Sequence, residues 1–151
     1  SNFDAKVSQS EEVNQALIDQ KKTFFDIVIL ASIVENEVRT KNDRRMVSDI
    51  FWRRLSIGQP LQSDATLQYV LGENVLQHSF EETRVNSPYN TYVNKGLPPG
   101  PIGNPGLESL LAAVYPTSNP YYYFLNDANT KETVFSTTFE EHVANKAKHG
   151  L

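Results

Sequence analysis

Two carboxylates end an otherwise apolar stretch of the chain, where acid chemistry would have an unusual environment. Glu35 and Glu37 follow an apolar run that extends from Ile27 to Val34. At 3.6 residues per helical turn, Glu35 falls on the face of Ala31, and Glu37 lies about 160° away. The two glutamates therefore face different sides of the predicted helix, and we do not expect them to form an acid/base pair within one cleft.

Glu35 is the stronger candidate for a general acid. The side chains one turn earlier, Ala31 and Ser32, are small and are expected to leave a hollow that a ligand can enter. Apolar neighbours favour the neutral form of a carboxyl group and so raise its pKa. A general acid needs that neutral form near pH 7. The alternative is a glutamate that an arginine holds at the end of the helix, and it stays open.

Two further clusters carry side chains suited to binding a sugar or a peptide. The first follows Pro60 and the second follows Ser87; together they contain Gln62, Ser63, Asp64, Tyr89, Asn90 and Tyr92. Hydroxyl, amide and carboxylate groups of this kind donate and accept the hydrogen bonds that a sugar requires. The same residue types also form Asx-type turns and satisfy the backbone of their own loops. Both interpretations remain open.

Charge is placed unevenly along the chain. The formal net charge is −4, which argues against a general nucleic-acid binder. Six cations against two carboxylates nevertheless give residues 39–54 a net charge of +4, which leaves −8 for the rest. This segment is either a solvated helix face or a local site for an anionic polymer or a carboxylate-bearing ligand.

Arg54 is the anomaly within that segment. On a helical projection it lies in the middle of the apolar arc formed by Met46, Val47, Ile50 and Phe51. A guanidinium on the core side must find a carboxylate or backbone carbonyls, because unpaired burial of a charge is costly. We expect either a structural ion pair or a role in the active site.

Several classes of protein are excluded by what the 151 residues lack. There is no cysteine, which removes disulfide scaffolds, zinc ribbons and cysteine catalysis. There is no glycine-rich phosphate loop, and the longest apolar run is too short to cross a bilayer. His78, His142 and His149 lack the spacing of metal ligands, and surface roles are expected for them. We therefore expect no metal and no cofactor.

The pattern of elements predicts a single α+β domain, in which helices precede a small antiparallel sheet. Seven of the eight prolines lie within 88–120, four of the seven glycines within 96–106 and six of the seven tyrosines within 89–123. This stretch is expected to form a structured, functional loop. Thr137 and Glu140 have the spacing of a capping box for a last helix that carries Phe139 and Val143. The other predicted helices cover 10–22, 24–38, about 43–57 (capped by Asn42 or Asp43) and 106–114, and the strands cover 121–125 and 133–136.

Taken in order, these segments resemble the YceG-like endolytic murein transglycosylases. The resemblance covers about residues 25–142, and its blocks follow the family's order. The blocks are Leu30-Ala-Ser-Ile-Val-Glu35-Asn-Glu37, Val47 through Phe51 to Arg54-Leu55, Gly58-Gln-Pro-Leu-Gln-Ser-Asp64-Ala-Thr66, Ser87-Pro-Tyr-Asn-Thr-Tyr92, Gly96-Leu-Pro-Pro-Gly-Pro-Ile102, Asn104-Pro-Gly106, Tyr121 to Leu125 and Phe135 to His142. The sequence departs from the family's pattern at Asn36, Ala65 and Thr133, where relatives have lysine, proline and often histidine.

The resemblance implies that residues 1–151 form one catalytic domain, in which a lysozyme-like helix carries the catalytic glutamate. It implies that Glu35 is this glutamate. The substrate-binding residues that we expect are Gln62, Ser63, Asp64, Tyr89, Asn90, Tyr92, Arg54 and Glu37. Full-length relatives carry one N-terminal transmembrane anchor and a small module upstream, which implies that the protein acts on the extracytoplasmic face of the bacterial cytoplasmic membrane.

The implied reaction is the internal cleavage of peptidoglycan strands between N-acetylmuramic acid and N-acetylglucosamine. It leaves a 1,6-anhydro end, with Glu35 as general acid and then base. A single well-placed glutamate suits this reaction, because the C6 hydroxyl of the sugar replaces the water that a second carboxylate activates in a hydrolase. The substrate partner is then peptidoglycan, and the cell-wall synthesis machinery is a further expected partner. The alternative is a non-catalytic peptidoglycan-binding module or a scaffold for cell-wall synthesis.

Overall fold

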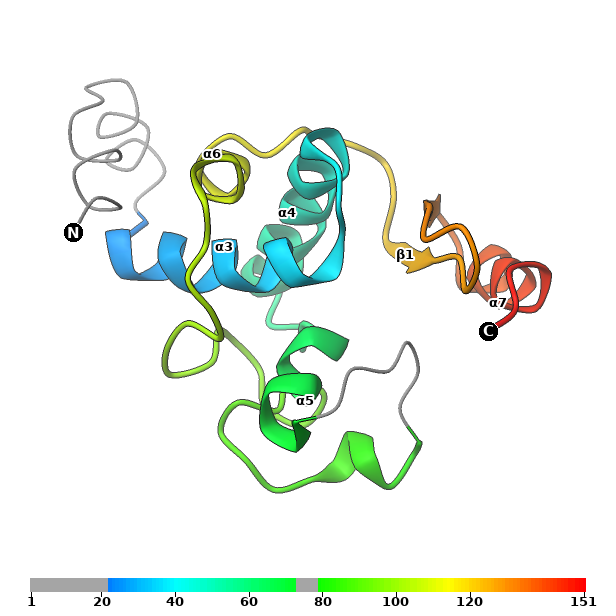
Figure 1. Cartoon of the computed structure of the whole chain (residues 1–151), viewed down its shortest axis with the longest axis horizontal. Helices are drawn as coiled ribbons and strands as arrows, with labels where there is room; N and C mark the ends of the chain where they lie inside the picture. Colours follow the sequence, from blue (N-terminus) through cyan, green and yellow to red (C-terminus); the bar gives the residue numbers. More distant parts are fainter. Residues whose placement is uncertain (1–21, 73–78) are drawn as a thin grey trace.

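The computed structural model describes residues 22–72 and 79–151, and Figure 1 shows the arrangement of their elements. The order along the chain is α3 (Phe24–Glu37), α4 (Lys41–Ser56), α5 (Asp64–Leu71), the 3₁₀ turn η1 (Glu82–Arg84), α6 (Leu107–Val114), β1 (Tyr123–Asn126), β2 (Thr133–Ser136) and α7 (Phe139–Lys148). This is the predicted α+β class. The predicted helix over 10–22 lies almost wholly outside the described residues.

Helix α3 is the centre of the core, as its apolar sequence predicts. Thr23 begins it with a capping box, in which its hydroxyl accepts from the Asp26 amide and the Asp26 carboxylate accepts from the Thr23 amide. Residues 29–34 are buried without a break, because α6 and α4 pack on different sides of the helix. A helix covered on several sides holds its C-terminal carboxylates in fixed positions.

Helix α4 packs across α3 and begins at a different cap from the predicted one. The Thr40 hydroxyl accepts from the Asp43 amide at 3.1 Å, so Thr40 is the N-cap and the prediction of Asn42 or Asp43 is wrong. The cause is local: threonine lies outside the helix in extended backbone, where its oxygen reaches the free amides of the first turn. Trp52 of α4 ties it to α6 by donating from Nε1 to the Ala113 carbonyl at 2.9 Å.

The C-terminal part consists of a two-stranded antiparallel hairpin covered by α7. Tyr123 pairs with Ser136 and Asn126 with Thr133, so β1 starts two residues later than predicted. The helix α7 is capped by Thr138, whose hydroxyl accepts from the Glu141 amide at 3.2 Å. The predicted capping box of Thr137 and Glu140 is therefore wrong by one residue. Figure 1 shows this part beside the helical part, and the packing of Phe51 against Phe124 joins them.

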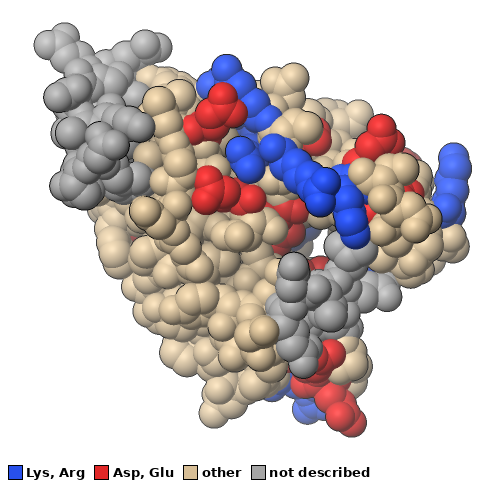
Figure 2. All heavy atoms as spheres, viewed as in Figure 1, with Lys and Arg blue, Asp and Glu red and all other residues tan. Residues whose placement is uncertain are grey.

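The proline- and glycine-rich segment forms an ordered loop, as predicted. Leu97 and Ile102 pack against the core, and the Ile102 amide donates to the Ser32 hydroxyl at 3.0 Å. Charge is uneven on the face drawn in Figure 2: a band of lysine and arginine, bordered by carboxylates, crosses its upper half, and its lower left is mostly uncharged. Among the described helices, none is long and apolar enough to cross a membrane.

Candidate active site

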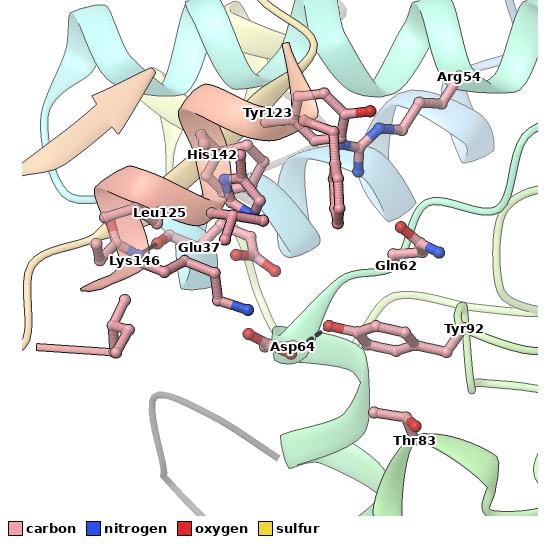
Figure 3. Close-up of a pocket in the computed structure, with 15 residues that line it drawn as sticks. Glu37, Arg54, Gln62, Asp64, Thr83, Tyr92, Tyr123, Leu125, His142 and Lys146 are labelled. Carbon is pink, nitrogen blue, oxygen red and sulfur yellow. Dashed lines mark hydrogen bonds between the residues drawn. The ribbon is translucent and has the colours of Figure 1, made fainter. Parts of the chain in front are cut away.

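A cavity of about 490 Å³ lies between the end of α3, the start of α5 and the hairpin with α7. Figure 3 shows its side chains pointing inward from these separate elements. The polar and aromatic groups that line it include Glu37, Arg54, Gln62, Asp64, Tyr92, Tyr123, His142 and Lys146. The sequence clusters around Glu37, Asp64 and Tyr92 therefore meet in one place, although up to 55 positions separate them along the chain.

Glu37 is held rigidly at the wall of this cavity. Its Oε1 accepts a short hydrogen bond from the Ser63 hydroxyl and a second, of 3.1 Å, from the Ala65 amide. Both donors belong to the start of α5, which Ser63 precedes as N-cap. The backbone amides at the start of a helix have no partner within the helix, so they are free to bind a carboxyl group.

The surroundings of Glu37 bring the pKa of its carboxyl group close to neutral pH. Burial and, to a smaller extent, the charge of the nearby Asp64 raise the pKa of Glu37, which reaches about 7. The hydrogen bonds from Ser63 and Ala65, and the Arg54 guanidinium, act in the opposite direction and are outweighed. A carboxyl group that is half protonated near pH 7 can donate a proton and then take one back.

Asp64 lies beside Glu37, and its side chain accepts a hydrogen bond from a tyrosine hydroxyl. The Tyr92 hydroxyl donates to Asp64 Oδ1 at 2.5 Å, as the dashed line in Figure 3 marks. Burial, followed by the charge of Asp64, raises the pKa of Tyr92 well above its usual range. Tyr92 therefore stays protonated and remains a hydrogen-bond donor to Asp64.

Arg54 resolves the anomaly in the sequence by bonding to backbone carbonyls. It is 8% exposed, and it donates to the carbonyls of Leu61 at 2.5 Å and Tyr122 at 2.9 Å. Burial lowers the pKa of Arg54, and the charge of Glu37 opposes that effect. The guanidinium thus joins the loop before α5 to the segment that leads into the hairpin, and it also lines the cavity.

Gln62 also lines the cavity, and it does so from a strained backbone position. Its φ is 55°, in the left-handed region that residues with a Cβ seldom adopt. Its amide donates to the Thr91 carbonyl at 3.1 Å. Strained non-glycine residues concentrate where function fixes a side chain, and Gln62 fits that pattern.

Helix α7 contributes two side chains that sequence reasoning missed. His142 and Lys146 lie one turn apart and both line the cavity, so the expected surface role of His142 is wrong. The His142 ring stacks on Tyr123 at 5.2 Å between centroids, and burial lowers the pKa of the imidazole. In Figure 3 the Lys146 ammonium points toward Asp64 and Glu37. Their four-residue spacing on one helix was the available signal.

His149 is not among the described residues that line this cavity. His149 Nδ1 lies 2.7 Å from Asp127 Oδ2 and ties the end of the chain to the hairpin turn, and His78 lies outside the described residues. Within 22–72 and 79–151, no three His, Asp or Glu side chains gather in a way that would hold a metal ion.

A second cavity of about 370 Å³ continues on the other side of Glu37. Glu37, Asp64 and Asn126 line both cavities, so the two form one groove that passes the carboxyl pair. Asn126 fixes this junction, because its Nδ2 donates to the Glu37 carbonyl at 2.7 Å and its Oδ1 accepts from the Thr133 hydroxyl at 2.9 Å. Thr133, where the sequence departs from the family pattern, thus supports the groove without lining it.

Glu35 lines the second cavity, but its surroundings differ from those that the sequence suggested. Its Oε1 accepts from the Gly106 amide at 2.8 Å and from the Ser109 hydroxyl at 3.1 Å, so it binds the start of α6. The expected hollow over Ala31 and Ser32 is absent. Both residues are fully buried, and the Ile102 amide donates a hydrogen bond to the Ser32 hydroxyl. The arginine cap considered as an alternative is absent as well, since α6 takes that place.

Three other predicted contact residues do not face either cavity. Asn90 is fully buried, and its side chain forms hydrogen bonds within its own loop. It donates to the carbonyls of Thr83 and Val85 and accepts from the Tyr92 amide. The Tyr89 ring packs against Tyr69 at 5.0 Å. Ser63 is 1% exposed, and its hydroxyl donates a hydrogen bond to Glu37. These residues position the site, and the expectation of direct substrate contact is corrected for them.

Comparison with known sequences identifies the class of protein to which this fold and this groove belong. The YceG-like family matches residues 1–148, and the chain belongs to that family. It is 38% identical over 141 residues to the endolytic murein transglycosylase of Bacillus subtilis (strain 168), covering 93% of this chain and 38% of that protein.

Two further relatives agree. The endolytic murein transglycosylase of Streptococcus pneumoniae D39 is 32% identical over 132 residues, covering 84% of this chain and 24% of that protein. The crystal structure of a YceG-like protein from Listeria monocytogenes superimposes with a TM-score of 0.81 at 41% identity, covering 89% of this chain and 44% of that one. The chain therefore spans less than half the length of these relatives.

Proposed function

We propose that this chain is the glycan-cleaving part of an endolytic murein transglycosylase, with Glu37 as its acid and base. The observation that carries the proposal is the raised pKa of Glu37, about 7, in a groove of two connected cavities. The relatives named endolytic murein transglycosylases supply the substrate class, which is peptidoglycan. Glu37 takes the role that the sequence had suggested for Glu35, because the Glu35 carboxylate is hydrogen-bonded to the start of α6.

The first half of the reaction breaks the glycosidic bond. Neutral Glu37 donates its proton to the oxygen that links N-acetylmuramic acid to the next N-acetylglucosamine. The bond from that oxygen to C1 breaks, and its electron pair stays with the departing sugar. Positive charge develops on the muramic ring, where the Asp64 carboxylate, bonded to Tyr92, offers the nearest fixed negative charge.

The second half closes a ring on the same sugar. Ionised Glu37 takes the proton from the C6 hydroxyl of the muramic residue, and O6 forms a bond to C1. The product is a 1,6-anhydro end, no water is consumed, and Glu37 is again neutral. The nucleophile belongs to the substrate, so its effective concentration is high without a protein group that positions water.

The aromatic side of the groove is suited to a sugar ring. Tyr123 stacks with His142, and Phe139 packs edge-on against Tyr123 at 5.9 Å. Aromatic faces bind the apolar face of a ring while polar groups nearby fix its hydroxyls. Lys146 and Gln62 supply such polar groups from opposite sides of the cavity.

The location of the whole protein follows from its substrate. Peptidoglycan lies outside the cytoplasmic membrane, so we propose that this domain acts there, in a longer protein that an upstream transmembrane helix anchors. The cell-wall synthesis machinery is the proposed neighbour. The non-catalytic alternative, a binding module or a scaffold, explains the groove but gives no reason for a carboxyl group with a pKa near 7.

The experiment that tests this function is mass spectrometry of uncrosslinked glycan strands after incubation with the protein. Strands shortened internally with 1,6-anhydro ends support the proposal. Shortened strands with reducing ends would show hydrolysis, with Asp64 serving as the second carboxylate. Strands that remain bound and uncut would show a binding module and overturn the enzymatic role.

A further inference from the structure

The second cavity contains cations that the proposed reaction does not use. Arg39, at the end of α3, and Lys131, in the hairpin turn, line it from two sides. Neither has a carboxylate within ion-pair distance among the described residues. Two unpaired cations in a concave site favour an anionic ligand.

The carboxylates in the same cavity are already engaged. Glu35 accepts from the Gly106 amide and the Ser109 hydroxyl, and Asp64 accepts from the Tyr92 hydroxyl. Glu37 is bound by Ser63 and Ala65, and its pKa of about 7 leaves much of it neutral at pH 7. The charge of Arg39 and Lys131 is therefore left for a ligand.

Most other cations of the positive segment hold the fold together. Arg44 Nε donates to the Val38 carbonyl at 3.2 Å, and Arg53 bonds to Asp49, Asn119 and the Tyr121 carbonyl. Arg54 binds carbonyls from the inside. Arg39 has no such partner, and of the six cations in 39–54 it alone lines the second cavity.

The hairpin turn holds Lys131 in an unusual backbone conformation. Its φ is 66°, a left-handed conformation in which glycine is the favoured residue. Its ammonium donates to the Ala128 carbonyl at 3.0 Å, and its own amide donates to the Asp127 carbonyl at 3.1 Å. A half-buried lysine at a position better suited to glycine suggests that its charge has a use.

We propose that the second cavity is a subsite for a carboxylate-bearing substituent of the glycan strand, held by Arg39 and Lys131. The inference rests on the proposed function, because Glu37 fixes where the scissile bond lies and the cavity is the next stretch of the groove. In peptidoglycan such carboxylates come from two sources: the lactyl group of muramic acid when the stem peptide is absent, and the stem peptide when it is present. The subsite therefore selects strands by their charge on one side of the cut.

The test is equilibrium binding, which does not depend on cleavage. Three short soluble strands of the same length are compared by calorimetry: one with free lactyl carboxylates, one with stem peptides, and one whose lactyl carboxylates are capped as neutral methylamides. We expect the protein to bind at least one charged strand about five- to tenfold more tightly than the neutral strand. Raising the salt concentration should shrink that difference.

Lys131→Gly and Arg39→Gln are the informative variants. Glycine suits the left-handed turn, so Lys131→Gly should keep or raise the melting temperature while it removes the charge. Each variant should lose most of the preference for the charged strand and bind the neutral strand like the parent. Lys95→Gln, an exposed lysine that lines neither cavity, is the matched control and should keep the preference.

The outcomes separate this inference from the proposed function. Preference for the lactyl strand alone assigns the lactyl carboxylate, and preference for the stem strand alone assigns the peptide; either supports the subsite. Equal binding of charged and neutral strands, or a full preference retained by Lys131→Gly and Arg39→Gln, would overturn it. A protein that binds selectively but never cuts would instead reject the enzymatic proposal and leave the subsite standing.

Discussion

The end of helix α3 places two glutamates, two residues apart, in opposite chemical settings. On one side, Glu35 meets the start of α6 and is bound by the Gly106 amide and the Ser109 hydroxyl. On the other side, Glu37 lies half-buried at the groove beside Asp64. A carboxylate at a helix start gains from its charge, whereas a buried carboxyl next to another carboxylate gains from being neutral. The neighbouring elements therefore give the two glutamates different chemical environments.

A large effect is expected on the pH dependence of cleavage. Glu37 must carry a proton to act as an acid, and its pKa is about 7. The protonated fraction therefore falls about tenfold per pH unit above that value, and cleavage at pH 9 should be about 100-fold slower than at pH 6. Initial rates over this range measure it. A rate that is flat up to pH 9 would contradict the role of Glu37.

Removing the titrating group should change how stability depends on pH. The folded protein keeps the Glu37 proton up to about pH 7, whereas the unfolded chain loses it near 4.5. The free energy of unfolding therefore falls as pH rises from about 4.5 to about 7, and Glu37→Gln should remove roughly 1–3 kcal/mol of that fall. Urea unfolding at several pH values measures it.

The matched control for that experiment is Glu132→Gln, an exposed carboxylate in the hairpin loop. It should leave the pH dependence of stability as it is. If Glu37→Gln and Glu132→Gln behaved alike, the burial of Glu37 would not be the cause of its raised pKa.

On the other side of α3, Glu35→Ala should weaken the attachment of α6. The variant loses two hydrogen bonds to a charged acceptor and leaves the start of α6 without its cap, at a cost of about 1–2 kcal/mol. Thermal unfolding measures the loss. Cleavage by the folded variant should stay within a few-fold of the parent, and a loss of activity without a loss of stability would reverse the roles of the two glutamates.

The smallest effect is expected from Ser63→Ala. The Ser63 hydroxyl donates to Glu37 and thereby lowers the pKa of that carboxyl group. Without it the pKa should rise, and the alkaline limb of the pH–rate profile should move upward by less than about one pH unit. A limb that moves downward would show that Ser63 acts on some other group.

The sequence allowed the class of fold to be predicted because the signals were local. The apolar run of α3, the glycine- and proline-rich loop and the strand Thr133–Ser136 each follow from a few neighbouring residues. The caps at Thr40 and Thr138 were missed by one to three positions, because several polar residues in a row compete for each cap. Family membership was predictable from the order of the motifs.

The choice between Glu35 and Glu37 could not be made from the sequence. A helical projection gives the angle between two side chains, but not the element that covers each face. Here α6 covers one face and α5 the other, through contacts to Gly106 and Ala65 that lie 71 and 28 positions away. Asn90 was misjudged for the same reason, since its buried partners belong to the loop that it braces.

The most direct test compares Glu37→Gln with Glu35→Gln on the same stem-bearing strands at pH 6. Glutamine keeps the size of each side chain and removes only the acid. The count of 1,6-anhydro ends by mass spectrometry should fall by a factor of about 10²–10⁴ for Glu37→Gln and remain near the parent value for Glu35→Gln. Anhydro ends that persist with Glu37→Gln and vanish with Glu35→Gln would contradict the account.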